Sequence, residues 1–169
     1  AVNFSYAKQI FSAIRTLDMF IRLATVEDAE QGLATLRASN SELCSLDHAN
    51  DPQQISDWLE NKTVQSWMDW AKNPKAKLYV ADSEGQILGV SMIQNSGHIL
   101  LNYVHPDARF SGVSSSFLSQ MEANAREMGR THCTLNSTKT ARPFYLKHGY
   151  LPLHGGECVT LSKLLRHSR

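Results

Sequence analysis

Residues 103–116, Tyr-Val-His-Pro-Asp-Ala-Arg-Phe-Ser-Gly-Val-Ser-Ser-Ser, join a predicted strand to a predicted long helix that begins near Val113. The first N–H groups of a helix have no partners inside the helix and carry partial positive charge. Gly112 lets an anion approach them because it has no Cβ, and Arg109 adds a positive guanidinium. The stretch therefore predicts an anion site, although an ordinary loop before a serine-rich helix start would have the same pattern.

Two common phosphate motifs do not fit this stretch. A Walker A loop ends in Gly-Lys-Ser/Thr, and a dinucleotide-binding fingerprint has three spaced glycines after a parallel strand. Neither pattern occurs here, because Gly112 is followed by valine and serine and is the one glycine of the stretch. Nucleotide triphosphate and dinucleotide sites of these two kinds are therefore not indicated.

Upstream of the stretch, turn signals predict a three-stranded antiparallel meander. Its strands are expected over 77–82, 86–93 and 98–104, with turns at Ser83-Glu84-Gly85 and Asn95-Ser96-Gly97. A strand over 20–24 comes earlier, and helices are expected after Thr25, after Asp51-Pro52 and over 63–72.

Downstream, the predicted elements are the helix over 113–128, a strand over 131–135, a short helix over 141–147 and strand-like stretches over 150–154 and 158–164. A meander that passes into a βαβ unit predicts an α/β domain. We therefore expect a single domain with a mixed central sheet flanked by helices.

The first 18 residues stand apart from this order. Their apolar residues have helical spacing, which predicts an N-terminal helical extension over 1–18 ahead of a domain over 19–169. Met19 opens a segment that itself resembles a protein start, so whether residues 1–18 are native stays open. The apolar face of this helix is suited to packing on the domain or to a homodimer.

Composition excludes several classes of partner. With 17 basic and 16 acidic residues among 169, the net charge of +1 gives no electrostatic footprint for nucleic acid or an acidic membrane surface. Cys44, Cys133 and Cys158 lack metal-type spacing, and the histidines are scattered. No apolar run approaches the ~20 residues of a membrane span. We expect a cytoplasmic protein with reduced thiols and without a metal, nucleic-acid or membrane partner.

Two segments resemble motifs of the GNAT acetyltransferase superfamily. Tyr103-Val104-His105-Pro106-Asp107, followed by Arg109, Gly112, Ser114 and Leu118, is similar to its acetyl-CoA motif, Val-x-Pro and then Gln/Arg-x-x-Gly-x-Gly/Ala. Residues 141–150, Ala-Arg-Pro-Phe-Tyr-Leu-Lys-His-Gly-Tyr, resemble its second signature, Ala-x-x-Phe-Tyr-x-x-x-Gly-Phe/Tyr. Residues 20–29 are similar to the family's first strand and helix, so the resemblance covers about 19–154.

The resemblance implies a site for acetyl-CoA as co-substrate. In the family, the sheet opens after the strand that ends here at Val104, and the pantetheine arm pairs with backbone near Tyr103 and Val104. The pyrophosphate takes backbone N–H groups, here those of Phe110, Ser111, Gly112, Val113 and Ser114, with the Arg109 guanidinium beside them. Asn136 is a candidate to bind the pantetheine amides, and equally a candidate to cap the next turn.

The resemblance also implies the chemistry. A primary amine of a small molecule, peptide or protein attacks the thioester directly, and Tyr145 matches the tyrosine that protonates the departing thiolate. The alternative for Tyr145 is packing beside Phe144. Trp58 and Trp67 are expected in the core, and Trp70 is expected to face out.

The sequence departs from the family pattern at several positions. Phe110 and Ser111 stand where glycine and arginine are common, and Ser114 replaces the second glycine. Leu100 occupies the position of an acidic base found in some relatives. By strand alternation His98 and Asn102 share the face of Leu100, which makes His98 a candidate base, although an exposed histidine beside a turn is the more common case.

These departures leave three functions open. The first is an N-acetyltransferase. The second is a CoA-binding sensor or interaction module with the same fold and weak or no catalysis. The third is a binding domain that does not use CoA.

Overall fold

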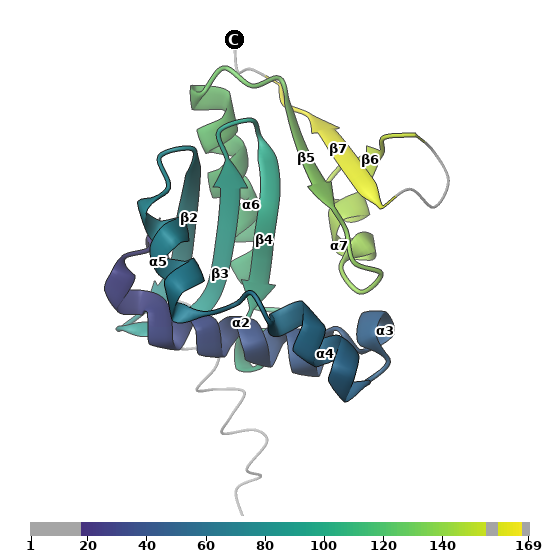
Figure 1. Ribbon diagram of the computed structural model, residues 1–169. Helices are drawn as coiled ribbons and strands as arrows, with labels where there is room; N and C mark the ends of the chain where they lie inside the picture. The colour runs from purple at the N-terminus through teal and green to yellow at the C-terminus, as the bar shows by residue number, and fades with distance from the viewer. Residues whose placement is uncertain (1–17, 155–158, 167–169) are drawn as a thin grey trace, which may run out of the picture.

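The computed structural model describes residues 18–154 and 159–166, so the helical extension predicted over 1–18 lies, apart from Asp18, outside the described part of the chain. The strands form one seven-stranded sheet in the order β1-β2-β3-β4-β5-β7-β6 (Figure 1). This sheet and its flanking helices confirm the predicted α/β class.

The elements have the following bounds. The strands are β1 (Phe20–Leu23), β2 (Ala76–Ser83), β3 (Gln86–Gln94), β4 (His98–Val104), β5 (His132–Asn136), β6 (Leu151–Pro152) and β7 (Thr160–Leu164). The helices are α2 (Ala29–Leu43), α3 (Ser45–His48), α4 (Pro52–Leu59), α5 (Val64–Lys72), α6 (Val113–Glu127) and α7 (Arg142–Lys147), with short 3-10 turns η1 (Val26–Asp28) and η2 (Pro106–Ala108).

The strand pairing confirms the predicted meander. Strands β1, β2, β3 and β4 pair antiparallel in chain order, β4 pairs parallel with β5, and β7 pairs antiparallel with both β5 and β6. The sheet is therefore mixed, as predicted. Two details differ from the prediction: the strand expected over 150–154 contributes only the two residues of β6, and the short helix α3 was not predicted.

Local capping explains where the helices begin. The Thr25 N–H donates to Asp28 Oδ2 at 2.8 Å, as the predicted capping box requires. The Asp51 carboxylate accepts from the Gln53 N–H at 2.8 Å, with proline at the first helical position of α4. The Thr63 hydroxyl accepts from the Ser66 N–H at the start of α5. Each satisfies an N–H group that the helix itself leaves free.

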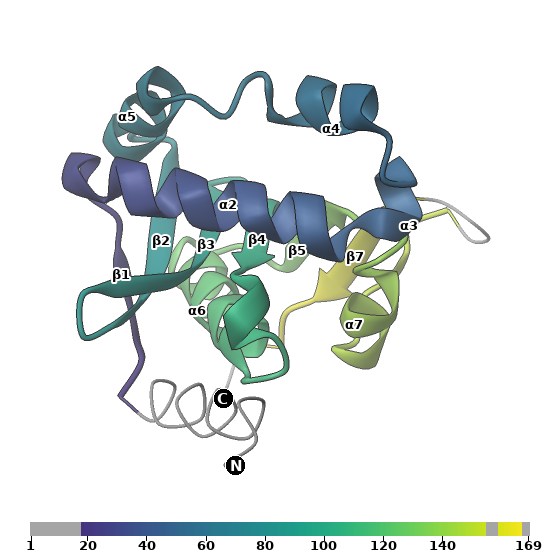
Figure 2. The ribbon, with the colours of Figure 1, turned by 90° about the horizontal axis from the view of Figure 1, so that it is seen from below.

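Two hydrophobic layers cover the two faces of the sheet. On one face, α2 and α5 pack through residues that include Leu33, Leu36 and Trp67. On the other face, α6 packs through residues that include Phe117 and Met121. Figure 2 shows α2, α4 and α5 on one side of the sheet and α6 and α7 on the other. We call these the α2 face and the α6 face.

Trp67 is the largest side chain in the α2-face layer. It is fully buried, and its Nε1–H donates to the Thr25 carbonyl at 2.8 Å. Gly32 of α2 lies against the indole, and a Cβ at that position would sit 2.1 Å from the ring. The glycine thus lets the helix close over the tryptophan.

The other two tryptophans differ from the prediction. Trp58 is not in the core, because α4 has no buried residue, and Trp58 itself is half-buried. Trp70 does not face out, because it is half-buried against the α2-face layer. Helical periodicity alone does not reveal how far α4 stands off the sheet.

Within residues 18–154 and 159–166, no helix combines the length and apolar character needed to cross a membrane. In the same residues, His, Cys, Asp and Glu side chains do not gather in groups of three or more that could hold a metal ion. Cys44 and Cys133 are buried free thiols, and burial raises the pKa of each to about 11. Both therefore stay protonated near neutral pH.

Candidate functional site

The sheet opens between its two central strands. Strands β4 and β5 pair only at His98 with Thr134 and at Ile99 with Leu135. Beyond Ile99, β4 runs on to Val104 and pairs only with β3, while β5 leans away from it (Figure 1). The backbone groups of β4 that face the gap are therefore not used by β5.

A β-bulge at Leu100 marks the start of this opening. Ile99 pairs with Ile93 and Leu101 pairs with Met92, so Leu100 is the extra residue of β4. The bulge changes the phase of the strand: Ile99 packs in the α6-face layer and Leu101 in the α2-face layer.

The bulge corrects the prediction that His98, Leu100 and Asn102 share one face. After the phase change Asn102 lies on the α6 face, opposite Leu101. His98 instead lies with its Nδ1 2.8 Å from Thr134 Oγ1. It does not line the cavity described next, and desolvation lowers its pKa. His98 is therefore poorly placed to act as a base there.

A cavity of about 500 Å³ occupies the opening. It is bounded by β4, the turn after it, the first turn of α6, the end of β5, α7 and the C-terminal end of α2. The structure brings together all but one of the predicted site residues as lining: Tyr103, Val104, Arg109, Phe110, Gly112, Val113, Ser114, Asn136 and Tyr145. The exception is Ser111, whose hydroxyl instead donates to the Ala108 carbonyl.

The turn before α6 exposes main chain to the cavity. Gly112 is the N-cap of α6 with φ of +86°, and a Cβ there would meet open space. Phe110 also has positive φ, and its side chain is 92% exposed, with the Arg109 guanidinium 4.5 Å from the ring centre. The turn thus directs its largest side chain outward. The first N–H groups of α6 are left for a ligand.

Gly89 of β3 allows α6 to lie close to the sheet, which sequence reasoning missed. A Cβ on Gly89 would lie 2.7 Å from the Phe117 ring, and 2.9 Å from both Val113 Cγ1 and the Tyr103 carbonyl oxygen. A glycine inside a strand often marks such close approach, and this signal was present in the sequence.

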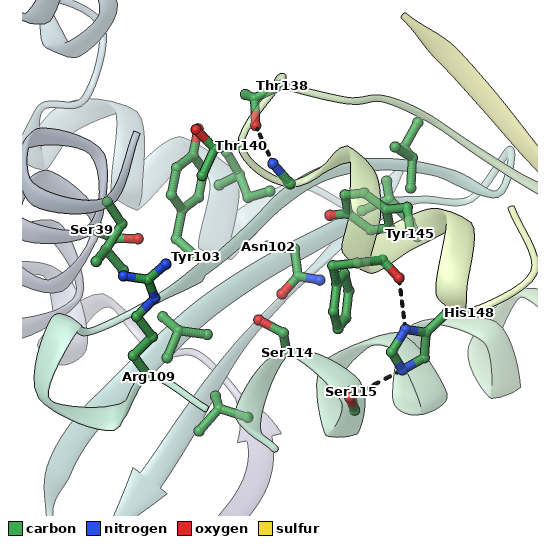
Figure 3. A pocket seen from close by; sticks show the side chains of 18 of the residues that line it. Ser39, Asn102, Tyr103, Arg109, Ser114, Ser115, Thr138, Thr140, Tyr145 and His148 are labelled. Carbon is green, nitrogen blue, oxygen red and sulfur yellow. Dashed lines mark hydrogen bonds between the residues drawn. The ribbon is translucent and has the colours of Figure 1, made fainter. Parts of the chain in front are cut away.

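Tyr145 projects from α7 toward the cavity. The side chain is only 6% exposed, and burial raises its pKa to about 12, an effect that the nearby Asn102 side chain partly offsets. Its ring makes edge-to-face contacts with Phe144 and Tyr150. Figure 3 shows Asn102 between Ser114 and Tyr145. Tyr145 therefore both packs against aromatic neighbours and presents a protonated phenol.

Two further contacts shape the cavity. The Asn136 side chain, at the end of β5, accepts a hydrogen bond from Thr160 Oγ1 at 2.9 Å. Asp47 of α3 accepts hydrogen bonds from the Lys139 N–H at 2.7 Å and from the Thr140 hydroxyl at 2.6 Å. The unpredicted helix α3 is thereby tied to the loop that leads into α7.

The buried tyrosines give stability a pH dependence. Burial raises the pKa of Tyr145 to about 12 and raises that of fully buried Tyr150 as well. An unfolded tyrosine has a pKa of about 10, so this contribution is fully present below pH 10 and is lost as pH rises toward the folded values. We expect the urea midpoint to be steady from pH 7 to 9 and to fall above pH 10. A midpoint unchanged at pH 11 would contradict the burial of these phenols.

Comparison with known proteins identifies the class. A GCN5-related N-acetyltransferase from Rhodopseudomonas palustris superposes with a TM-score of 0.77 at 23% identity, over 86% of this chain and 95% of its own. The PaiA N-acetyltransferase from Thermoplasma acidophilum, solved with coenzyme A, gives 0.74 at 18% identity, over 86% and 98%. A GNAT acetyltransferase from Brucella melitensis, solved with acetyl-CoA, gives 0.59 at 18% identity, over 89% and 90%.

These similarities define an acetyltransferase-type fold. No curated protein sequence matches the chain. A sequence model of the acetyltransferase (GNAT) domain, however, matches residues 46–160, which is more than half of the chain. The protein therefore belongs to the GNAT acetyltransferase family, as the two sequence motifs predicted.

Proposed function

We propose that the protein transfers an acetyl group from acetyl-CoA to a primary amine, with Tyr145 as general acid. The observation that carries this proposal is the cavity in the β4–β5 opening, which connects the N-terminus of α6 with Tyr145. A phosphate-binding helix end and a buried acid at two parts of one cavity suit a long substrate with a phosphate group at one end and a thioester at the other.

The α6 end of the cavity is assigned to the pyrophosphate. The backbone N–H groups from Phe110 to Ser114 are its donors, and the positive side chains of Arg109 and Lys147 also line the cavity. Because backbone groups make these bonds, Ser111 and Ser114 in place of arginine and glycine are compatible with binding. The structural similarity to proteins solved with coenzyme A and with acetyl-CoA supports this assignment.

The β4 side of the opening is assigned to the pantetheine arm. Its amides would pair with the free backbone groups of β4 near Tyr103 and Val104, where a strand would otherwise pair. Asn136 lines the far side of the same cavity. Binding in this slot would hold the thioester near Tyr145 and so bring the acetyl group and the acid together.

In the proposed reaction, the amine nitrogen attacks the thioester carbonyl, the C–N bond forms and the C–S bond breaks. The attacking nitrogen gives up one proton to solvent, the departing thiolate takes one from the Tyr145 hydroxyl, and the phenolate that remains regains a proton from solvent. A phenol with a pKa of about 12 is fully protonated near neutral pH, so the donor is always available. The acceptor is a small molecule, a peptide or a protein that carries a primary amine.

A specific observation favours a second candidate, a CoA-binding module with weak or no catalysis. Leu100, the bulge residue at the mouth of the opening, lines the cavity and is 43% exposed. A leucine at this position supplies no carboxylate to take the proton from an incoming ammonium group before the neutral amine attacks. Transfer would then depend on amines that arrive neutral or on a water molecule as base.

Two measurements separate these functions. Calorimetric titration with acetyl-CoA tests binding, and release of free CoA thiol across a panel of primary amines tests transfer. Binding with amine-dependent thiol release supports the transferase. Binding and thermal stabilisation without thiol release supports the module, and no shift of melting temperature at saturating acetyl-CoA contradicts both.

A further inference from the structure

A hydrogen-bonded pair links the first turn of α6 to the end of α7. The Ser115 Oγ lies 3.1 Å from His148 Nε2, and His148 Nδ1 lies 2.8 Å from the Phe144 carbonyl oxygen. Figure 3 shows both contacts and places the imidazole between the two helices. Ser115 and His148 also line the cavity, so the link lies at the site itself.

The geometry fixes the roles of the two ring nitrogens. A carbonyl oxygen can only accept, so Nδ1 of the neutral imidazole carries the hydrogen and donates it to Phe144. Nε2 then accepts from the Ser115 hydroxyl. The ring also packs against the Phe144 ring, with centroids 4.3 Å apart. His148 is thus held by Ser115 on one side and by α7 on the other.

We propose that His148 is a positioning residue that couples the phosphate-binding turn of α6 to the placement of Tyr145. The proposal rests on the proposed function. Ser115 is the third residue of α6, directly after the N–H groups assigned to the pyrophosphate. Tyr145 precedes His148 by three residues, so the two lie within about one helical turn of each other. A displacement of the first turn of α6 would therefore be passed to the Tyr145 phenol through the His148 side chain.

The coupling implies that the Ser115 hydroxyl is not a phosphate ligand. Its hydrogen is directed to His148, so the backbone N–H groups of this turn and the other lining side chains, such as Ser114 and Arg109, remain for the anion. The binding of CoA should then depend little on this hydroxyl, while the position of Tyr145 depends on it. A contact that only stabilised the fold would not alter the position of Tyr145 while leaving the affinity for CoA unchanged.

The kinetic test uses Ser115→Ala, which removes only the donor. We expect kcat to fall about tenfold, because small displacements of a catalytic group are costly. The dissociation constant of CoA, measured by calorimetry, should change less than about threefold, since the backbone donors remain. Ser115→Thr keeps a hydroxyl, so its kcat should be close to that of the wild-type protein. Ser119→Ala, on the exposed side of the same helix, is the matched control and should leave kcat unchanged.

A double-mutant cycle tests whether the loss passes through Tyr145. In a Tyr145→Phe background, Ser115→Ala should lower kcat by less than about twofold, because the group it positions is gone. The proposal is overturned if the tenfold loss persists in that background. It is equally overturned if Ser115→Thr is as slow as Ser115→Ala.

Hydrogen exchange tests the link independently of activity. In the ligand-free protein, Ser115→Ala should make the amides of residues 145–149 exchange about fivefold faster, as expected for a lost hydrogen bond, and Ser115→Thr should not. Unchanged exchange in Ser115→Ala overturns the proposal. If the wild-type protein neither binds CoA nor releases thiol, the proposed function fails, and this measurement still decides whether α6 and α7 are linked.

Discussion

Replacing Tyr145 by phenylalanine is expected to lower kcat by about a hundredfold, the range of a lost general acid. The phenyl ring keeps the edge-to-face contacts with Phe144 and Tyr150, so the fold and the cavity walls are retained. In the proposed mechanism, the substitution removes the proton that the departing thiolate takes from Tyr145. Steady-state kinetics with acetyl-CoA and a reactive amine give kcat, and calorimetry should show an unchanged affinity for CoA.

Tyr150→Phe is the matched control for this substitution. Tyr150 is also buried, but its hydroxyl donates to Glu122 Oε1 at 3.1 Å and does not line the cavity. Its removal should cost stability, because it leaves Glu122 with one donor fewer, and should leave kcat within about twofold. Equal kcat values for Tyr145→Phe and wild type would remove Tyr145 from the mechanism.

Replacing Trp67 by alanine is expected to lower the free energy of unfolding by about 3–5 kcal/mol, the usual cost of removing a buried tryptophan. The substitution leaves a cavity where the indole now packs against Gly32. It also removes the N–H that donates to the Thr25 carbonyl, which then has no side-chain donor from this position. Because domains are stable by only about 5–15 kcal/mol, this loss is a large fraction of the total stability. Urea denaturation followed by circular dichroism measures the loss.

The neighbouring tryptophan provides the comparison. Trp70 lies one turn further along α5 and is only half-buried against the same layer. Trp70→Ala should therefore cost clearly less than Trp67→Ala, about 1–2 kcal/mol for partial loss of apolar burial. Similar losses for the two variants would show that the indole of Trp67 is not the anchor of the α2-face layer.

Much of the fold was predictable because local signals marked most of its boundaries. Capping residues such as Thr25, Asp51 and Thr63 satisfy the free N–H groups of their own helices, which is a property of a few adjacent residues. The candidate site was predictable for a different reason. The turn before α6 and the helix of Tyr145 each carry a motif, and the motifs imply one cavity.

The features that the sequence did not predict share a physical cause, because each depends on contacts between segments that are distant in the chain. The phase change at Leu100 arises from the pairing of β4 with β3, so strand alternation read along β4 alone placed His98 and Asn102 on one face. Helix α3 is held by Asp47 against a loop more than ninety residues away. The Ser115–His148 contact likewise joins two motifs that were read separately.

The opening after Ile99 has a consequence for self-association. A strand whose main-chain donors and acceptors lack partners is a template for pairing with another polypeptide, and proteins usually protect such edges. Here the unpaired side of β4 faces inward across the gap to β5 and α7, within one molecule. The protein therefore keeps an incomplete hydrogen-bond ladder inside its own cavity, and this side of β4 is not offered to neighbouring molecules as an aggregation-prone edge.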